Sequence, residues 1–247
     1  MNELLTINNL SKSYNSLAGE VKAIENLSLC VKNGEFVSII GPSGCGKSTL
    51  LNILSGLDKD YTGSFKFNDN VKVSYMLQED SLFPWLSVFE NAVIGLKIQK
   101  KFNEDSSNYV MHLLKKYGLG EFIDKKVSSL SGGMKQRVAL IRTLATKPNL
   151  IFLDEPFSAL DYQTRLKVSD DIYRIIKNEN ITVIMVSHDI AESISLSERV
   201  VVLSKRPSKV KNIYNIILTN KSNPIDNRKA PEFSYYYDLI WKDIDND

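Results

Sequence analysis

The stretch Gly41-Pro42-Ser43-Gly44-Cys45-Gly46-Lys47-Ser48-Thr49 matches the pattern G-x-x-x-x-G-K-[ST] at every defined position. The apolar run 36–40 before it predicts a buried strand, and leucines at positions 50, 51 and 54 predict one face of a helix that starts near Lys47. Glycines in such a loop let backbone N–H groups close around phosphate oxygens, and the helix N-terminus adds its partial positive charge. The stretch therefore predicts a phosphate-binding loop between a strand and a helix.

Two side chains of this loop carry specific chemistry. We expect the Lys47 ammonium to reach the β- and γ-phosphates of a nucleotide, and the Ser48 hydroxyl to ligate Mg²⁺. The nucleotide-binding residues predicted from the whole loop are Gly41, Ser43, Gly44, Cys45, Gly46, Lys47, Ser48 and Thr49.

A second candidate site lies at the end of the run Leu150-Ile151-Phe152-Leu153-Asp154-Glu155. Four apolar residues predict a buried strand, which ends in two adjacent carboxylates. Asp154 is placed to hold Mg²⁺, directly or through water, and Glu155 to polarise an attacking water as a general base. Alone, two acids at a strand end are more often solvated side chains, but beside the phosphate loop they favour catalytic chemistry.

A histidine follows another apolar run. His188 comes shortly after residues 181–186, at the carboxyl end of an expected parallel strand, where open α/β sheets bind ligands. A neutral imidazole there can hydrogen-bond a γ-phosphate or the attacking water, and a structural histidine is an equally good explanation. His112 lies within a helical stretch and is interpreted as structural.

The tripeptide Ser131-Gly132-Gly133 precedes a run with apolar residues at helical spacing. A serine and two glycines at a helix start form a second site of the size of a phosphate. The alternative is a flexible helix N-terminus with a serine cap. The sequence thus predicts two phosphate sites but only one loop with a lysine.

Apolar runs along the chain indicate an α/β domain with a parallel sheet. Strand-like runs at 150–153, 181–186 and 200–203 alternate with helical segments such as 164–177. Aromatic and aliphatic residues at helical spacing predict a packing helix over about 231–245.

Local signals predict further features. Asn33-Gly34, between strand-like residues 27–31 and the strand at 36–40, predicts a hairpin that joins the two. Residues 82–146 are mainly helical in pattern. One helix there should end at Gly118, with Asp105 or Ser106 as its N-cap.

Composition excludes several classes of protein. The 247 residues include 31 Lys and Arg against 29 Asp and Glu, and a net charge of +2 does not support a dedicated nucleic-acid binder. Two cysteines cannot form a disulfide framework and fit a reduced cytosolic compartment. We find neither a signal peptide nor the roughly 18 to 20 apolar residues of a membrane-spanning helix. Any membrane role is expected to depend on partner chains.

The octapeptide Leu130-Ser131-Gly132-Gly133-Met134-Lys135-Gln136-Arg137 resembles the signature motif of the ATP-binding subunits of ABC transporters. The loop at 41–49 and the strand at 150–155 resemble the Walker A and Walker B motifs of that family, and the resemblance covers about residues 4–245. It implies an α/β P-loop NTPase fold of the ABC type. That fold has a mixed sheet core, an N-terminal antiparallel β-subdomain and an inserted helical subdomain at about 82–146, in a single domain of residues 1–247.

The resemblance also implies functions for individual residues. Tyr14 stacks on adenine, and Gln78 is the Q-loop glutamine that senses Mg²⁺ and the attacking water. Residues 158–161, with Asp161, resemble the D-loop at the dimer interface, and His188 becomes the switch histidine. Two subunits pair head to tail, so that Ser131, Gly132 and Gly133 of one chain close over ATP held by Lys47 of the other.

The partners implied by the resemblance are a second ATP-binding subunit, which favours a homodimer, permease subunits in the membrane and, indirectly, a solute-binding protein. The chain would then be an ATPase that uses ATP and Mg²⁺ at the cytoplasmic face of the membrane. Residues 78–88 resemble the Q-loop region of nitrate, sulfonate and taurine importers, and importers of thiamine-precursor pyrimidines are similar. Within this segment, Trp85 is equally well explained as a buried aromatic or as part of a permease-binding surface.

Three other classes of protein are weighed against a transporter subunit. A P-loop kinase of small molecules has no use for residues 130–137. A DNA-repair ATPase needs a long coiled coil between the Walker motifs, where only the 100 residues 50–149 are present. An ABC-type assembly ATPase that binds no permease stays an alternative, although residues 83–85 favour a transporter.

Overall fold

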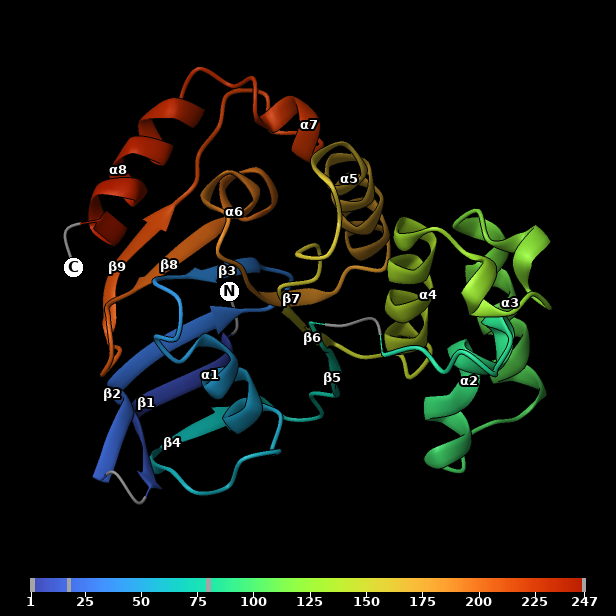
Figure 1. Cartoon of the computed structure of the whole chain (residues 1–247), viewed down its shortest axis with the longest axis horizontal. Helices are drawn as coiled ribbons and strands as arrows, with labels where there is room; N and C mark the ends of the chain where they lie inside the picture. Colours follow the sequence, from blue (N-terminus) through green and yellow to red (C-terminus); the bar gives the residue numbers. More distant parts are fainter. Residues whose placement is uncertain (1–2, 17–18, 79–80, 246–247) are drawn as a thin grey trace.

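The computed structural model describes residues 3–16, 19–78 and 81–245 of the chain. This part contains two β-sheets, whose strands Figure 1 shows. The larger sheet is formed by β3 (Phe36–Ile40), β5 (Val73–Met76), β6 (Leu150–Asp154), β7 (Thr182–Val186), β8 (Arg199–Leu203) and β9 (Val210–Asn215). The smaller sheet is formed by β1 (Glu3–Ser16), β2 (Gly19–Lys32) and β4 (Thr62–Phe67).

The larger sheet is mixed, as expected. Its strand order is β5-β6-β7-β3-β8-β9, with five parallel strands and an antiparallel β9 at one edge. Every residue of β3, β6 and β7 is buried, because both faces of the sheet are covered. The smaller sheet, in the order β2-β1-β4, is antiparallel throughout. The predicted fold class is therefore confirmed.

Asn33-Gly34 forms a turn, but the predicted hairpin is wrong. The Glu35 N–H donates to the Lys32 carbonyl across the turn at 3.3 Å, and Gly34 has a φ of +75°, whereas Asn33 has no positive φ. A two-residue hairpin of type I′ needs positive φ at both central residues. The chain instead crosses from one sheet to the other, so that β2 pairs with β1, and β3 pairs with β7 and β8.

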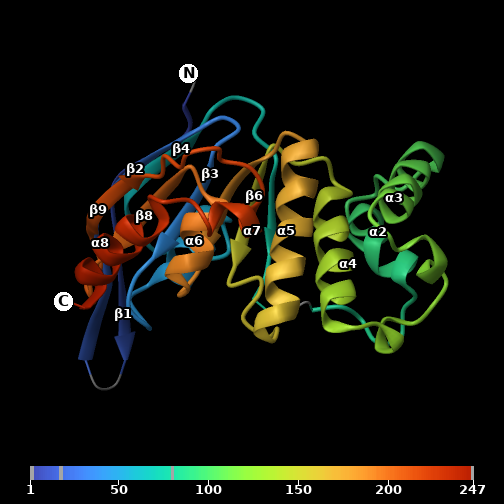
Figure 2. The ribbon, with the colours of Figure 1, turned by 90° about the horizontal axis from the view of Figure 1, so that it is seen from above.

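The helices divide into a group around the sheets and a group that extends away from them (Figures 1 and 2). The extended group lies within residues 82–146, where a mainly helical pattern was expected. It comprises α2 (Val88–Ile98), α3 (Glu104–Lys116), two short 3₁₀ turns (Gly120–Phe122 and Val127–Ser129) and α4 (Gly132–Leu144). The other helices are α1 (Lys47–Leu54), α5 (Tyr162–Asn178), α6 (Ile190–Leu196), α7 (Pro224–Asn227) and α8 (Phe233–Asp245).

Alternate residues of the strands enter different parts of the core. Val183 and Met185 of β7 pack on the side of α4 and α5, whereas Ile184 and Val186 pack on the side of α1 and the smaller sheet. A third group of buried side chains joins β8, α6 and α8, and includes Ile240 of α8. The C-terminal segment is thus a packing helix, although Trp241 on it is 52% exposed.

The ends of α3 correct one detail of the sequence reading. Gly118 follows the helix with a φ of +76°, as predicted. The N-cap is Asn103, because its side chain accepts a hydrogen bond from the Ser106 N–H, and Ser106 in turn accepts one from the Asn103 N–H. Ser106 is therefore the third residue of a capping box and not the cap.

The topology brings the candidate residues to one edge of the larger sheet. The phosphate loop follows β3, Asp154 is the last residue of β6, and His188 follows β7, which lies between them. Because these strands are parallel, their carboxyl ends meet at the same edge. Within the described ranges, the chain has no helix with the length and apolar character needed to cross a bilayer.

Candidate active site

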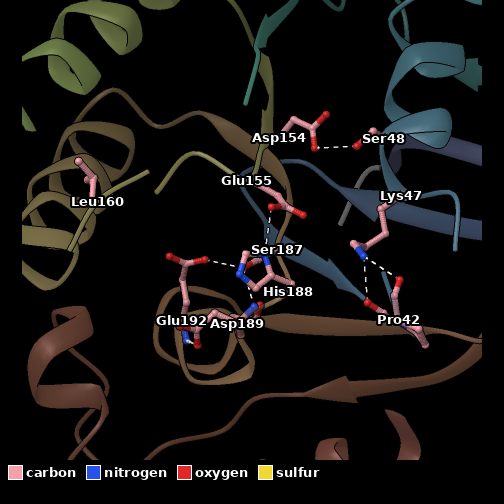
Figure 3. A network of polar contacts seen from close by, with 12 residues as sticks. Pro42, Lys47, Ser48, Asp154, Glu155, Leu160, Ser187, His188, Asp189 and Glu192 are labelled. Carbon is pink, nitrogen blue, oxygen red and sulfur yellow. Dashed lines mark hydrogen bonds and ion pairs between the residues drawn. The ribbon is translucent and has the colours of Figure 1, made fainter. Parts of the chain in front are cut away.

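The phosphate loop wraps around its own lysine. Lys47 is the first residue of α1 and is 6% exposed, and its Nζ donates to the carbonyls of Gly41 at 2.9 Å and Pro42 at 3.1 Å (Figure 3). Gly46, with a φ of +112°, occupies the N-cap of α1, and no side chain in the described part of the protein caps this helix. The N-terminal N–H groups of α1 are therefore free of a side-chain acceptor and are suited to an anion.

A cavity of about 500 Å³ lies over this loop. Lys47 and Arg206 contribute two positive charges to its lining, and Glu155 contributes one negative charge. This excess of positive charge suits a polyphosphate. The lining residues are Ser43, Gly44, Gly46, Lys47, Ser48, Thr49, Glu155, His188 and Arg206.

Ser48 and Asp154, which the sequence assigned to Mg²⁺, are brought together. The Ser48 hydroxyl donates to Oδ1 of Asp154 at 3.0 Å, and the Tyr75 hydroxyl donates to Oδ2 at 2.9 Å. Burial raises the pKa of Asp154, and the two hydrogen bonds oppose that rise. Burial also raises the pKa of Tyr75, as does the neighbouring carboxylate, so its phenol remains a donor.

Glu155 and His188 form a pair at the carboxyl ends of β6 and β7. Nδ1 of His188 lies 3.0 Å from Oε2 of Glu155 (Figure 3). Glu155 has a φ of +44°, in the left-handed region, and its N–H donates to the Val186 carbonyl at 2.9 Å. This uncommon backbone conformation turns the Glu155 side chain towards His188 at the neighbouring strand end.

Tyr14 lies on β1 beside the first turn of α1. Its hydroxyl is 3.4 Å from Oγ1 of Thr49 and 3.5 Å from Oδ2 of Asp58. The Nζ of Lys12 lies 4.7 Å from the ring centroid and is itself bound by Asp58 at 3.0 Å. Tyr14 is 43% exposed, so a planar group can stack on the face of its ring that Lys12 leaves open.

The signature residues do not reach this cavity. Ser131 caps α4 by accepting a hydrogen bond from the Met134 N–H at 3.4 Å, and neither it nor Gly132 nor Gly133 lines the cavity. A Cβ on Gly133 would lie 2.6 Å from Cγ2 of Val168, so that α4 and α5 can pack closely only with glycine there. Within one chain, therefore, Ser131 acts as the serine cap of a helix, which was the alternative to a second phosphate site.

Gly41, Tyr14 and Asp154 are not among the residues that line the cavity, and three more predicted residues also lie outside its lining. Gln78 is exposed just beyond β5, and Glu79 and Asp80 of the same segment lie outside the described residues. Asp161 is the N-cap of α5 and accepts a hydrogen bond from the Thr164 N–H at 3.1 Å, and the Thr164 side chain together with this N–H lowers the pKa of Asp161. Cys45 is buried in the core below the loop, and burial raises the pKa of its thiol.

Two residues of the site were not predicted from the sequence. Arg206 lines the cavity, and its Nε donates to the Gly44 carbonyl at 3.0 Å across 162 positions of sequence. Tyr75 binds Asp154 across 79 positions. Each follows or belongs to a strand of the larger sheet, so a correct strand order is the signal that would have found them.

Comparison with known proteins places this chain in a family. The family model described as "ABC transporter" matches residues 24–158. The aliphatic sulfonates import ATP-binding protein SsuB of Bacillus cereus is 39% identical over 212 residues, which cover 83% of each chain. The taurine import ATP-binding protein TauB of Jannaschia sp. is 37% identical over 240 residues, or 93% of this chain and 90% of TauB. An uncharacterised ABC transporter ATP-binding protein of Bacillus subtilis, YtlC, is 38% identical over 98% of this chain and 96% of its own.

A solved structure shares the architecture. The dimeric post-hydrolysis state of the ATP-binding cassette MJ0796, bound to ADP and Pi, superposes with a TM-score of 0.72 at 31% identity. The superposition covers 87% of this chain and 99% of MJ0796. The chain belongs to the ABC transporter family, as an ATP-binding subunit that hydrolyses ATP.

Proposed function

We propose that this chain is the ATP-hydrolysing subunit of an importer and works as a head-to-tail homodimer. The observation that carries the dimer is that the cavity over Lys47 lacks Ser131, Gly132 and Gly133 of its own chain. A second copy in the opposite orientation would bring the N-terminus of its α4 over the nucleotide. Each ATP would then lie between Lys47 of one chain and Ser131 of the other, with Asp161 near the interface.

The binding residues proposed for ATP are those of the phosphate loop together with Tyr14. Lys47 would exchange its two backbone carbonyl acceptors for phosphate oxygens, and Tyr14 would stack on adenine through its open face. Arg206, which lies in the same cavity, adds positive charge beside Gly44. In this arrangement positioned cations and N–H groups stabilise the charge of phosphoryl transfer.

The donor set at the end of β6 fits Mg²⁺. Ser48 and Asp154 present a hydroxyl and a carboxylate 3.0 Å apart, and oxygen donors of this kind are the ligands that Mg²⁺ prefers. Gln78 is proposed as a further contact to the metal and the attacking water. When bound, Mg²⁺ supplies charge neutralisation at the phosphates, and Tyr75 keeps Asp154 oriented.

Glu155 and His188 are proposed as the catalytic pair. The Glu155 carboxylate would accept a proton from the attacking water, and His188 would hold that carboxylate in place or bind the γ-phosphate. The hydrogen bond between Nδ1 of His188 and Glu155 supports the first of these functions.

The transported solute is proposed from the relatives. SsuB and TauB are named for aliphatic sulfonates and taurine, which favours a small organic or inorganic anion such as a sulfonate, taurine or nitrate. A thiamine-precursor pyrimidine and an assembly function without a permease are the alternatives. The partners would be permease subunits at the cytoplasmic face of the membrane and, through them, a solute-binding protein. We also propose one ABC domain over residues 1–247, with a helical subdomain at about 82–146 and a short C-terminal helix.

The experiment that tests this proposal is affinity purification of the tagged chain from solubilised membranes. A permease that copurifies, together with ATPase activity that its solute-binding protein stimulates with a sulfonate, would support an importer. Lys47→Ala is the matched control, because it should retain the permease and lose ATP binding. Copurification of soluble proteins without a permease would favour the assembly ATPase instead.

A further inference from the structure

A buried carboxyl group lies behind the segment that carries His188. Glu192 of α6 is 3% exposed, and its Oε2 accepts a hydrogen bond from the Ser187 hydroxyl (Figure 3). The same hydroxyl accepts a hydrogen bond from the Asp189 N–H at 3.0 Å. The residues on either side of His188 are therefore both held by a network that ends on Glu192.

We propose that Glu192 is a positioning residue, which fixes Ser187 and Asp189 so that His188 keeps its contact with Glu155. This inference rests on the function proposed for His188 and Glu155. His188 itself is more than half exposed, with a side chain that is 57% accessible, so its own packing does not fix it. The order of the segment must come from Ser187, which is buried, and from Asp189, which is half-buried, on either side of it.

The network continues from Asp189 to the loop before α5. Oδ1 of Asp189 accepts a hydrogen bond from the Glu192 N–H at 2.9 Å, and its Oδ2 lies 3.3 Å from the Arg165 guanidinium. Arg165 also donates to the Leu160 carbonyl at 3.1 Å, next to Asp161. Glu192 is thus linked, through Asp189 and Arg165, to the segment proposed to face the partner subunit.

Burial of Glu192 affects its protonation. The pKa of Glu192 is raised to about 7, because burial and the Asp189 carboxylate together outweigh the Ser187 hydrogen bond and the charges of Arg165 and Arg228, which lower it. In the described part of the chain Oε1 of Glu192 has no hydrogen-bond partner, so ionisation would place a charge where one oxygen is unsatisfied. Ionisation would also set the Glu192 charge against the Asp189 carboxylate, and this repulsion would loosen the segment that carries His188.

The test compares Glu192→Ala and Glu192→Gln with wild type, in the complex with the permease. Glu192→Ala should lower kcat on the order of 10- to 100-fold, because the catalytic pair is displaced, with little change in KM for ATP. Glu192→Gln keeps an acceptor for Ser187 without a charge and should stay within about twofold of wild type at pH 6.5. The ratio of its kcat to that of wild type should rise as the pH passes 7.

Ser195→Ala is the matched control, because Ser195 is a buried serine on α6 whose hydroxyl bonds the Glu192 backbone carbonyl and not the His188 segment. It should leave kcat unchanged. If Glu192→Ala folds poorly, Ser187→Ala removes the donor and should lower kcat in the same way. A wild-type kcat in both Glu192→Ala and Ser187→Ala would overturn the proposal. So would a loss of kcat in Glu192→Gln, or in Ser195→Ala, as large as the loss in Glu192→Ala. A wild-type complex without ATPase activity would instead overturn the proposed function.

Discussion

The Ser48 hydroxyl donates a hydrogen bond to Oδ1 of Asp154 at 3.0 Å and so joins the first turn of α1 to the end of β6. The two residues are 106 positions apart in sequence. Ser48 follows β3 and Asp154 ends β6, and β7 lies between these two strands in the sheet. Both oxygens face the edge where the phosphate loop closes. The fold therefore brings together the two residues proposed to bind Mg²⁺.

Replacement of Ser48 tests the metal site. We expect Ser48→Ala to reduce ATPase activity and to raise the Mg²⁺ concentration needed for half-maximal activity, because one oxygen donor is lost. A Mg²⁺ titration of the ATPase rate measures this. Ser55→Ala, at the other end of α1, is the control and should match wild type, since among the described residues that hydroxyl bonds only the Asn52 carbonyl. An unaltered Mg²⁺ requirement in Ser48→Ala would show that Ser48 is not a ligand.

Glu155→Gln separates binding from catalysis. The amide retains the size of the carboxylate but cannot accept a proton, so turnover should fall by about 10² to 10⁴ while ATP binding remains. Single-turnover hydrolysis and equilibrium binding of a labelled ATP, measured on the same preparation, check both expectations. Hydrolysis at the wild-type rate would exclude Glu155 as the general base.

Tyr14 provides a test of the adenine site. Tyr14→Ala should weaken ATP binding by about 1–3 kcal/mol, the usual contribution of a base stacked on an aromatic ring. Tyr14→Phe retains the ring and loses only the long contacts of the hydroxyl to Thr49 and Asp58, so its affinity should stay near that of wild type. Isothermal titration with ATP distinguishes the two variants. Equal affinities of the Ala variant and wild type would place adenine elsewhere.

The packing of α4 against α5 predicts the effect of an added methyl group. Gly133→Ala should destabilise the chain by about 1–3 kcal/mol, because its Cβ would lie 2.6 Å from Val168. Gly95→Ala, also within a helix, meets only Thr146 at 3.8 Å and should stabilise by about 0.5–1 kcal/mol. Urea unfolding measures both. A Gly133→Ala variant as stable as wild type would mean that α4 and α5 can move apart without cost.

Local features of the site were predictable from the sequence, because a short stretch determines them. The loop at 41–49 contains its glycines, its lysine and the start of its helix in consecutive positions, and the strand that ends in Asp154 is a continuous apolar run. The alternation of such runs with helices also predicted the sheet. None of these inferences needed long-range contacts.

Other features depend on backbone angles or on distant partners. The turn at Asn33-Gly34 was misread as a hairpin because the dipeptide permits positive φ at both residues, whereas only Gly34 adopts it. Arg206 and Glu192 are ordinary charged residues in the sequence. Only the fold places the first over Gly44 and buries the second behind His188.

The helical segment α2–α4 leaves the sheet from β5 and returns to it through β6, and these two strands are paired neighbours. Tyr75 on the outgoing strand holds Asp154 on the returning strand. A pull on the helices from a bound permease would therefore act on both sides of one hydrogen bond. The two strands that anchor the helical segment thus meet at the residue proposed as a metal ligand, so that movement of the helices would reach the phosphate site directly.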